Sequence, residues 1–255
     1  MQVTMSANLR AQFDRDGYLL GIPILTLEEV KYYNGCYDRL VEKSIERSGK
    51  GRICNQHFMD PEFYALATRD CVLDLVEAAV GPDILLMSSG FFVKQPGSSS
   101  EFVAWHQDTM YWGLEPPFAA TVWLALDDSD TENGCMRVIP GTHKYGLLPH
   151  AEARKVGNVL AHDQEISAEH FDESTAVDFV LKAGFASLHH GELVHGSNPN
   201  CSTRRRCGMT MRYTTPNVKP VYGGRFPFSE KPILVRGEDR YGHFNLSPPP
   251  QAVTA

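Results

Sequence analysis

One short stretch carries the strongest signal in this sequence: residues 105–112 read Trp-His-Gln-Asp-Thr-Met-Tyr-Trp. It places the imidazole of His106 and the carboxylate of Asp108 two residues apart. In an extended strand such residues project to the same face, about 7 Å apart along the chain at a rise of roughly 3.3 Å per residue. We therefore expect both side chains to be able to bind one divalent metal ion.

A third metal ligand is expected from the second half of the chain, where His195 lies in the run Gly-Glu-Leu-Val-His-Gly-Ser. Two histidines and one carboxylate on one face of a metal ion, with open positions opposite, form the facial triad of non-haem Fe(II) oxygenases. A His-x-Asp pair alone is a weak signal, and a hydrogen-bonded histidine is its ordinary alternative. The aromatic residues Trp105, Tyr111 and Trp112 around the pair favour a small-molecule pocket.

The composition predicts a globular protein that does not bind nucleic acid. The chain has 255 residues, of which 42% are apolar, and a formal net charge of −7. It therefore lacks the basic field that phosphate-backbone binding needs. No run approaches the roughly 18 apolar residues of a membrane-spanning helix, and the N-terminus lacks a signal-peptide layout. We expect a soluble cytoplasmic protein, a monomer or a homodimer, whose partner is a small molecule rather than a membrane.

The cysteines show no C-x-x-C spacing in a chain much longer than disulfide-stapled domains, so we expect reduced thiols, several of them buried. They are Cys36, Cys54, Cys71, Cys135, Cys201 and Cys207.

The first 82 residues are predicted to be mostly helical. A capping box formed by Thr26 and Glu29 begins an amphipathic helix that runs to about residue 48. Asp60 and Pro61 begin another helix. The remaining predicted helices are 9–17 and 71–80, with a short strand at 18–20 and a break at 49–51.

From Asp83 onward the sequence changes to short apolar runs separated by turn residues. The predicted strands are 84–87, 91–93, 118–126, 135–139, 176–181, 186–189, 194–197 and 207–214. Many short strands without intervening helices favour a double-sheet jelly roll. We expect one domain over 1–255, with a helical part at about 1–82, a jelly-roll core at about 83–225, and a C-terminal extension at about 226–255 whose tail, 247–251, is mobile.

The composition of two further segments suggests a role for each. The irregular polar stretch 145–175 is either a lid or substrate loop, or a merely decorative insertion. After His195 the chain turns, and Arg204–Arg206 open the next strand. An arginine there can offer a bidentate fork to a carboxylate near the metal, whereas a solvated basic patch is the expectation for Arg204 and Arg205.

Three separated motifs together resemble the phytanoyl-CoA dioxygenase family of Fe(II)- and 2-oxoglutarate-dependent oxygenases. They are His106-Gln107-Asp108, the run Glu-Asn-Gly-Cys-Met-Arg-Val-Ile-Pro-Gly-Thr-His at 132–143, and His195-Gly196-Ser197-x-x-Asn200-x-Ser202-x-x-x-Arg206. The resemblance spans about residues 10–225. It implies a mainly β fold with flanking helices. The core would be a double-stranded β-helix, a cupin-like jelly roll, with N-terminal helices packed on its major sheet. It also implies iron bound by His106, Asp108 and His195.

The resemblance implies a cosubstrate site as well. Arg206, eleven residues after the distal histidine, would bind the C5 carboxylate of 2-oxoglutarate. Ser197 and Trp123 would line the cosubstrate pocket, with Gln107 nearby, and Arg204 is the alternative to Arg206 if the turn is shorter.

The implied reaction hydroxylates or otherwise oxidises an unactivated C–H bond with O2, releasing succinate and CO2, and ascorbate can stimulate it. Halogenating relatives carry glycine or alanine where Asp108 stands, so its carboxylate favours hydroxylation over halogenation. Substrate contacts are expected from residues that flank the ligand-bearing stretches: Phe92, Lys94, Tyr111, Trp112, Met136 and Arg137. Lys94 and Arg137 favour an anionic or zwitterionic, polar or natural-product-like compound, although either could serve a surface ion pair.

Two other functions remain open at this point. One is a non-catalytic jelly-roll protein that binds metal, and the other is a cupin-like isomerase or hydrolase that does not use 2-oxoglutarate. The second alternative gives Arg206 no reason to stand where it does.

We predict that Asp108→Ala abolishes hydroxylation, because the site loses its carboxylate ligand. Succinate and hydroxylated product would be measured with 2-oxoglutarate under air and added Fe(II) and ascorbate. Full turnover by the variant would contradict the assignment of the three metal ligands.

Overall fold

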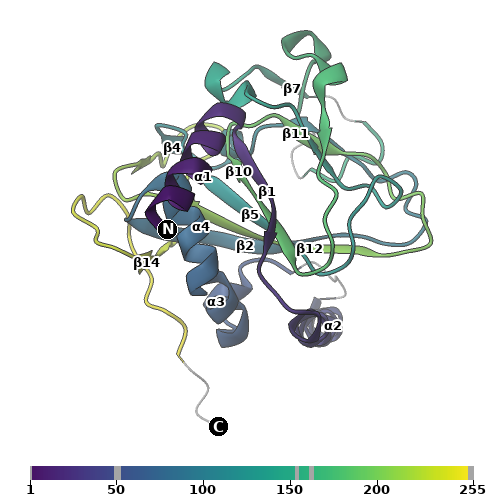
Figure 1. Ribbon diagram of the computed structural model, residues 1–255, viewed down its shortest axis with the longest axis horizontal. Coiled ribbons are helices and arrows are strands. Elements are labelled where there is room, and N and C mark those ends of the chain that lie inside the picture. Colours follow the sequence, from purple (N-terminus) through teal and green to yellow (C-terminus); the bar gives the residue numbers. More distant parts are fainter. Residues whose placement is uncertain (1, 49–52, 153–154, 161–163, 252–255) are drawn as a thin grey trace.

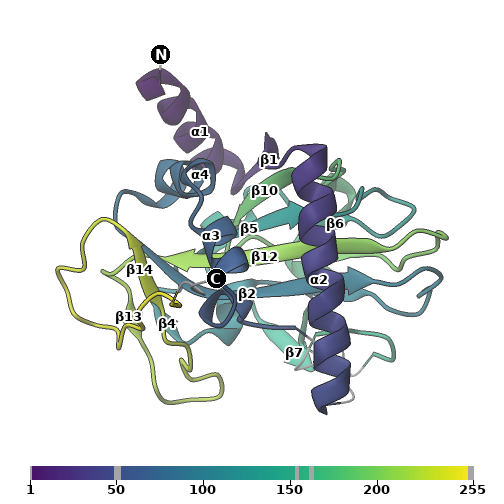
Figure 2. The same cartoon turned by 90° about the horizontal axis from the view of Figure 1, so that it is seen from below.

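The computed structural model describes residues 2–48, 53–152, 155–160 and 164–251. Two antiparallel sheets lie face to face, and α-helices pack on the outer face of the larger sheet (Figures 1 and 2). Apolar side chains of β5 and β6, among them Ala125 and Val138, join the two sheets from inside. The arrangement confirms the predicted jelly roll with N-terminal helices on its major sheet.

The major sheet has the strand order β1-β10-β5-β12-β2-β14. The bounds in that order are Tyr18–Pro23, Phe185–His190, Ala120–Ala125, Arg206–Thr214, Ile84–Lys94 and Ile233–Arg236. The minor sheet has the order β3-β11-β6-β9, with bounds Val103–His106, His195–Ser197, Met136–Val138 and Val177–Asp178. Two small sheets pair β4 (Leu114–Glu115) with β13 (Lys219–Pro220), and β7 (His150–Glu152) with β8 (Gln164–Ile166).

The described α-helices are α1 (Gln2–Asp16), α2 (Leu27–Ser48), α3 (Pro61–Ala67) and α4 (Asp70–Val80). Short 3-10 helices are η1 (Gln56–Phe58), η2 (Asp108–Tyr111), η3 (Thr142–Tyr145), η4 (Ala168–His170) and η5 (Glu173–Thr175). None of the helices in these segments is long and apolar enough to cross a membrane.

The predicted helix starts are confirmed at two places. The Thr26 amide donates to Glu29 Oε2 at 2.8 Å, and the Glu29 amide donates back to Thr26 Oγ1 at 3.3 Å. Asp60 accepts from the amide of Glu62 at 3.0 Å, with Pro61 at the first helical position. Both caps satisfy amides that the helix itself leaves unpaired. The six cysteines are free, and three of them, Cys36, Cys135 and Cys207, are buried, as predicted.

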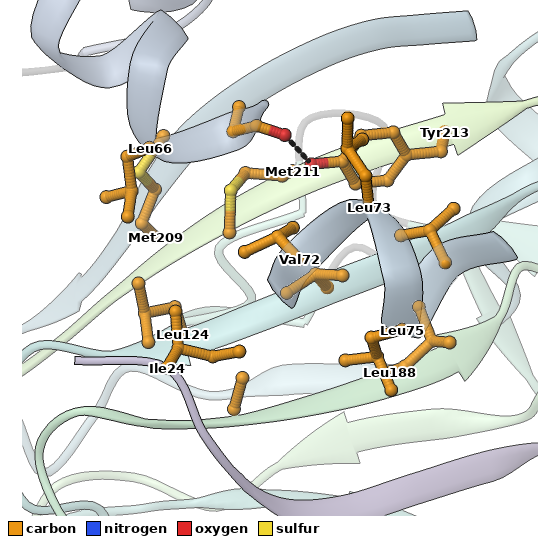
Figure 3. Packing of buried hydrophobic residues seen from close by; sticks show 14 of the residues in the cluster. Ile24, Leu66, Val72, Leu73, Leu75, Leu124, Leu188, Met209, Met211 and Tyr213 are labelled. Atoms are coloured by element: carbon orange, nitrogen blue, oxygen red, sulfur yellow. Dashed lines mark hydrogen bonds between the residues drawn. The ribbon is translucent and has the colours of Figure 1, made fainter. Parts of the chain in front are cut away.

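The outer face of the major sheet forms the main hydrophobic core with the helices. Alternate residues of its central strands, including Leu124, Leu188 and Met211, are fully buried against α3 and α4 (Figure 3). The hydroxyl of Tyr213 donates to the carbonyl of Ala67 at 2.7 Å, which satisfies a polar group inside this apolar layer (Figure 3).

The inner face of the same strands is polar, and the strand register arranges its side chains in rows. Directly opposite residues of an antiparallel pair project to the same face. The pairings of β10, β5, β12 and β2 place His189, Thr121, Arg212 and Ser88 in one such row. The next row contains Ser187, Trp123, Thr210 and Gly90. The candidate site is therefore built on this face.

Gly208 makes room for the Trp123 side chain on this inner face. A Cβ added at Gly208 would lie 2.0 Å from an atom of the indole ring. The indole extends from β5 over β12, so that its ring centre is 5.4 Å from the guanidinium carbon of Arg206. Any other residue at position 208 would collide with the indole.

Several predicted element bounds were wrong. The runs 84–87 and 91–93 belong to one strand, β2, because β12 pairs along it through Ser88–Gly90. The predicted strand 176–181 shortens to β9, and α1 starts at Gln2, where the sequence has no apolar stripe to reveal it. The C-terminal extension contributes β14 to the edge of the major sheet, beside β2. The expected break at 49–51 lies outside the described residues.

The stretch 145–175 is more regular than predicted. Its described part contains η3, the β7–β8 hairpin, η4 and η5. Residues 153–154 and 161–163 of the stretch are outside the described ranges. Its role as a lid stays a prediction.

We predict that Tyr213→Phe lowers the free energy of unfolding by about 1–3 kcal/mol, because the Ala67 carbonyl is left buried without its donor. Urea unfolding followed by circular dichroism measures this change. Tyr64→Phe is the matched control, because the Tyr64 hydroxyl forms no hydrogen bond with described residues, and we expect a change within about 0.5 kcal/mol. Equal losses in the two variants would contradict the role of the Tyr213 hydroxyl.

We predict that Gly208→Ala destabilises the fold by about 1–3 kcal/mol through overpacking, and that it shifts the tryptophan emission spectrum. Gly90→Ala serves as the control in the same sheet, since an added Cβ there meets nothing closer than 3.6 Å. The free energy of unfolding of Gly90→Ala should equal that of wild type or exceed it by up to about 1 kcal/mol. A Gly208→Ala variant as stable as wild type would show that the indole can lie elsewhere.

Candidate active site

Three potential metal ligands meet between the two sheets. His106 ends β3 and His195 begins β11, where they are cross-strand partners. Asp108 starts η2, so the strand ends before it, and the turn rather than strand alternation directs its carboxylate towards His106. One donor atom from each of the three buried residues lies within 4.8 Å of the others. The structure thus brings the three predicted ligands together, although by a different local geometry from the expected one.

Hydrogen bonds orient both imidazoles for metal binding. Nδ1 of His106 lies 2.9 Å from the carbonyl oxygen of Ala104, and Nδ1 of His195 lies 2.9 Å from that of Leu193. A carbonyl only accepts, so Nδ1 carries the proton in each ring and Nε2 keeps a free lone pair. These Nε2 atoms lie 3.6 Å and 3.9 Å from Oδ1 of Asp108. The three donors therefore suit one divalent cation.

The second oxygen of Asp108 is held separately. Thr121 donates its hydroxyl to Oδ2 at 3.1 Å, and Nε2 of His189 lies 3.6 Å from the same oxygen. Burial alone would raise the pKa of Asp108, but the contacts with His106 and His189 outweigh it and keep this pKa well below its usual value. Burial also lowers the pKa of His195 far below its usual value. Asp108 is therefore deprotonated and His195 neutral, and these are the forms in which the two residues bind a metal ion.

A cavity adjoins these ligands. The predicted residues that line it are the three ligands together with Phe92, Trp123, Met136, Ser197 and Arg206. His189 lines it as well, since strand alternation turns one of the neighbouring His189 and His190 towards the cavity. The lining residues that were not predicted are Val103, Thr121, Gly196, Thr210 and Arg212. Strand alternation could have found three of them: Thr121 lies two residues from Trp123, and Thr210 and Arg212 continue the face of Arg206.

Arg206 lies at one end of the cavity and is only 3% exposed. Its Nη1 donates to the carbonyl of Gly134 at 2.6 Å, and its Nε has no hydrogen-bond partner among the described residues. Burial lowers its pKa to about 10, so the guanidinium remains charged at neutral pH. A buried cation without a carboxylate partner is unfavourable, and a bound carboxylate would compensate it.

Lys94 is buried beside this end of the cavity, opposite Arg206 in the β2–β12 register. Its Nζ donates to Ser197 Oγ at 2.6 Å and also to the carbonyl of Asn198. Burial, together with the charge of Arg206, lowers the pKa of Lys94 to about 7. The structure thus places Lys94 behind Ser197 and not against the metal ligands.

Asn200 and Ser202 of the third motif build the turn that delivers Arg206. Nδ2 of Asn200 donates to the carbonyls of Gln95 at 3.0 Å and Arg204 at 2.7 Å. Its Oδ1 accepts from the Ser202 amide at 2.9 Å and the Ser202 hydroxyl at 2.8 Å. These two motif residues therefore stabilise the turn between β11 and β12 by hydrogen bonds to its backbone.

Gln107 is fully buried, but it does not line the cavity. Its Nε2 donates to the carbonyls of Gly146 at 2.8 Å and Glu192 at 2.6 Å, and its Oε1 accepts from the Leu148 amide at 2.8 Å. A side chain with all these bonds inside the protein ties 146–148 to the strand end. Gln107 therefore lies outside the cavity, and the expectation that it lies beside the cosubstrate was wrong.

Arg137 also lies outside the cavity, in contrast to its expected substrate contact. Its guanidinium donates to Asp178 at 3.1 Å and Glu173 at 3.2 Å. It forms the surface ion pairs that were its alternative role. Arg204 is exposed and pairs with Asp130 at 2.8 Å, so it does not replace Arg206.

Arg205 was expected in a solvated patch, but its Nε binds Asp127 at 2.8 Å. Tyr111 packs edge-on against Phe226, with ring centres 5.3 Å apart, and does not line the cavity. Trp112 lies in an adjoining groove next to Arg212, and its ring centre is 5.5 Å from the guanidinium carbon. The expected substrate contacts of Tyr111 and Trp112 are thus not in the cavity of the metal ligands.

Comparisons with known proteins agree with this architecture. The protein "Phytanoyl-CoA dioxygenase 1" of Oryza sativa subsp. japonica is 29% identical over 178 residues, which cover 70% of this chain and 60% of the rice protein. The alignment thus leaves two fifths of that relative unmatched. The solved structure of the non-heme monooxygenase ThoJ in its apo form is 30% identical, with a TM-score of 0.80, and the match covers 95% of this chain and 88% of ThoJ.

A structure of CytC3 with Fe(II) and alpha-ketoglutarate shares the fold at 23% identity, with a TM-score of 0.68, over 94% of this chain and 92% of CytC3. Residues 13–208 match the sequence profile described as "Phytanoyl-CoA dioxygenase (PhyH)". With two histidines and one aspartate gathered at its centre, the chain belongs to the phytanoyl-CoA dioxygenase family of Fe(II)- and 2-oxoglutarate-dependent oxygenases.

Proposed function

We propose that this chain is a dioxygenase that hydroxylates an unactivated C–H bond of a small molecule, using Fe(II), O2 and 2-oxoglutarate. The observation that carries the proposal is the combination found in one cavity. A cluster of two histidines and one aspartate lies beside a buried arginine that lacks a carboxylate partner. The first feature suits a metal ion and the second suits a dicarboxylate cosubstrate.

His106, Asp108 and His195 would hold the iron, and the iron when bound would supply the activation of O2. Their donor atoms fit this role because both Nε2 atoms and Oδ1 of Asp108 converge while the other polar atoms have protein partners. The Fe(II) and alpha-ketoglutarate in the CytC3 structure, which has the same fold, support the same pair here.

Arg206 would bind the distal carboxylate of 2-oxoglutarate through its free guanidinium edge. Ser197, oriented by Lys94, and the indole of Trp123 would complete the walls of this end of the cavity. Apolar walls such as Phe92 and Met136 exclude water from the reacting atoms. The chain's contribution is thus to position both reactants and to keep the site dry.

The reaction balances as R–H + O2 + 2-oxoglutarate → R–OH + succinate + CO2. Hydroxylation is favoured over halogenation because Asp108 occupies a ligand position with its carboxylate. A cupin-like isomerase or hydrolase would leave the buried charge of Arg206 without a use. Non-catalytic metal binding would leave it equally uncompensated.

We predict that Arg206→Gln raises the KM for 2-oxoglutarate by about ten- to hundredfold, the loss expected for a charge-assisted hydrogen bond. Succinate formation under air with added Fe(II) and ascorbate measures this constant. Arg204→Gln is the matched control, because Arg204 is exposed and paired with Asp130, and its KM should equal that of wild type. If Arg204→Gln raised the KM and Arg206→Gln did not, the assignment of the cosubstrate arginine would be reversed. Absence of succinate with wild type under all conditions would overturn the proposed function.

A further inference from the structure

We propose that Arg212 binds an oxyanion group of the substrate, a carboxylate or a phosphate, and so restricts the enzyme to acidic small molecules. This inference rests on the proposed function. It concerns the opposite end of the cavity from Arg206, since the two residues are six apart on β12 and their Cα atoms are about 20 Å apart at roughly 3.4 Å per residue.

Arg212 faces the reaction centre from the inner face of the major sheet. It stands in the row that contains Thr121 and His189, the two residues next to Oδ2 of Asp108. It lines both the cavity of the metal ligands and the adjoining groove that contains Trp112 and Glu230. A group bound to Arg212 would therefore place the neighbouring carbon atoms of the same molecule towards the metal ligands.

Two aromatic rings hold the guanidinium of Arg212 in place. Its central carbon lies 5.8 Å from the centre of the Phe92 ring and 5.5 Å from that of Trp112. Contacts with ring faces stabilise a cation without using its N–H donors, which lie in the guanidinium plane. The rings thus pre-orient the fork that binds carboxylates and phosphates in a bidentate manner.

These donors find no acceptor within the part of the chain that the structure describes. The Nε atom is buried without a hydrogen-bond partner, and Arg212 forms no ion pair with any described residue. By contrast, Arg137, Arg204, Arg205 and Arg236 are each paired with at least two carboxylates. Buried N–H donors without an acceptor are unfavourable, and a bound anion would supply the acceptor.

The acidic residues nearby do not fill this role. Glu230 lines the same groove, and its charge interacts with that of Arg212 without a hydrogen bond or ion pair between them, because Glu230 accepts from Nδ2 of Asn55 at 3.1 Å. Asp108 serves the metal site through Oδ1 and accepts from Thr121 through Oδ2. The structure therefore supports the anionic substrate that Lys94 and Arg137 had suggested, but assigns its recognition to Arg212.

The first test is a binding measurement on the metal-free protein, with Trp112 as the reporter. Phenylacetate, its neutral amide phenylacetamide, and phenylphosphonate are titrated while tryptophan emission is followed. We expect a saturable change with both acids, about tenfold or more weaker binding of the amide, and loss of the change in Trp112→Phe. No saturable response of wild type to either acid would overturn the proposal.

Variants then identify the residue that binds the acid. Arg212→Gln should weaken both acids by about tenfold or more, and Arg212→Lys should give an intermediate loss, because it keeps the charge without the fork. The ion-paired control Arg137→Gln should respond as wild type does. If Arg206→Gln lost the response and Arg212→Gln kept it, the acids would bind at the cosubstrate end and the inference would fail. Glu230→Gln should bind both acids at least as tightly as wild type, because it removes a negative charge from the groove, and weaker binding by this variant would contradict recognition of the acids by Arg212.

Turnover separates this inference from the proposed function. With substrate candidates offered as acid and amide pairs, the compounds that stimulate succinate formation should be acids. Neutral compounds that stimulate wild type and Arg212→Gln equally would overturn the inference while leaving the oxygenase assignment intact. A rise in the KM for 2-oxoglutarate equal to that of Arg206→Gln would instead make Arg212 part of the cosubstrate site. Acid binding by a wild type that forms no succinate would refute the proposed function alone.

Discussion

The cross-strand pairing of His106 with His195 is the contact on which the candidate site depends. It joins β3 to β11 so that two imidazoles from distant parts of the chain lie side by side, with ring centres 4.1 Å apart. Each ring is fixed by the carbonyl two residues before it. Gly196 permits the close approach of the strands, because an added Cβ would lie 2.8 Å from the carbonyl oxygen of Val103. The pairing of β11 with β3 changes register after His195, so this irregularity lies directly beside the metal ligands.

The major sheet separates two environments by strand alternation alone. Its outer face contributes Val122, Leu124 and Met211 to a core shared with the helices. Its inner face places Thr121, Arg212 and their neighbours in the cavity, where polar groups are buried at a cost. Many of these groups have protein partners, as Lys94 has in Ser197. The two inner-face arginines without carboxylate partners mark the two ends at which anionic ligands are proposed to bind.

Much of the fold could be predicted, because its signals are local. Caps at Thr26 and Asp60 and the glycine-proline stop after residue 80 act within a single turn of helix, and all were confirmed. The errors arose where a partner strand decides the outcome. The sequence of Ser88–Gly90 predicts a break between two strands, but β12 pairs along this segment and makes it part of β2. Likewise, β14 forms because the edge of β2 is available for pairing.

The sequence by itself determined the three motifs, the jelly roll and the family, since metal ligands and turn residues keep fixed chemistry and spacing. Only the tertiary structure decided which charged residues are free. Lys94, Arg137 and Arg212 look alike in the chain, yet Lys94 is bound to Ser197, Arg137 is paired with Asp178, and Arg212 alone among them faces the metal ligands without a partner. The physical reason is that the availability of a charge depends on what surrounds it in space, and those neighbours are contributed by strands far apart in the sequence.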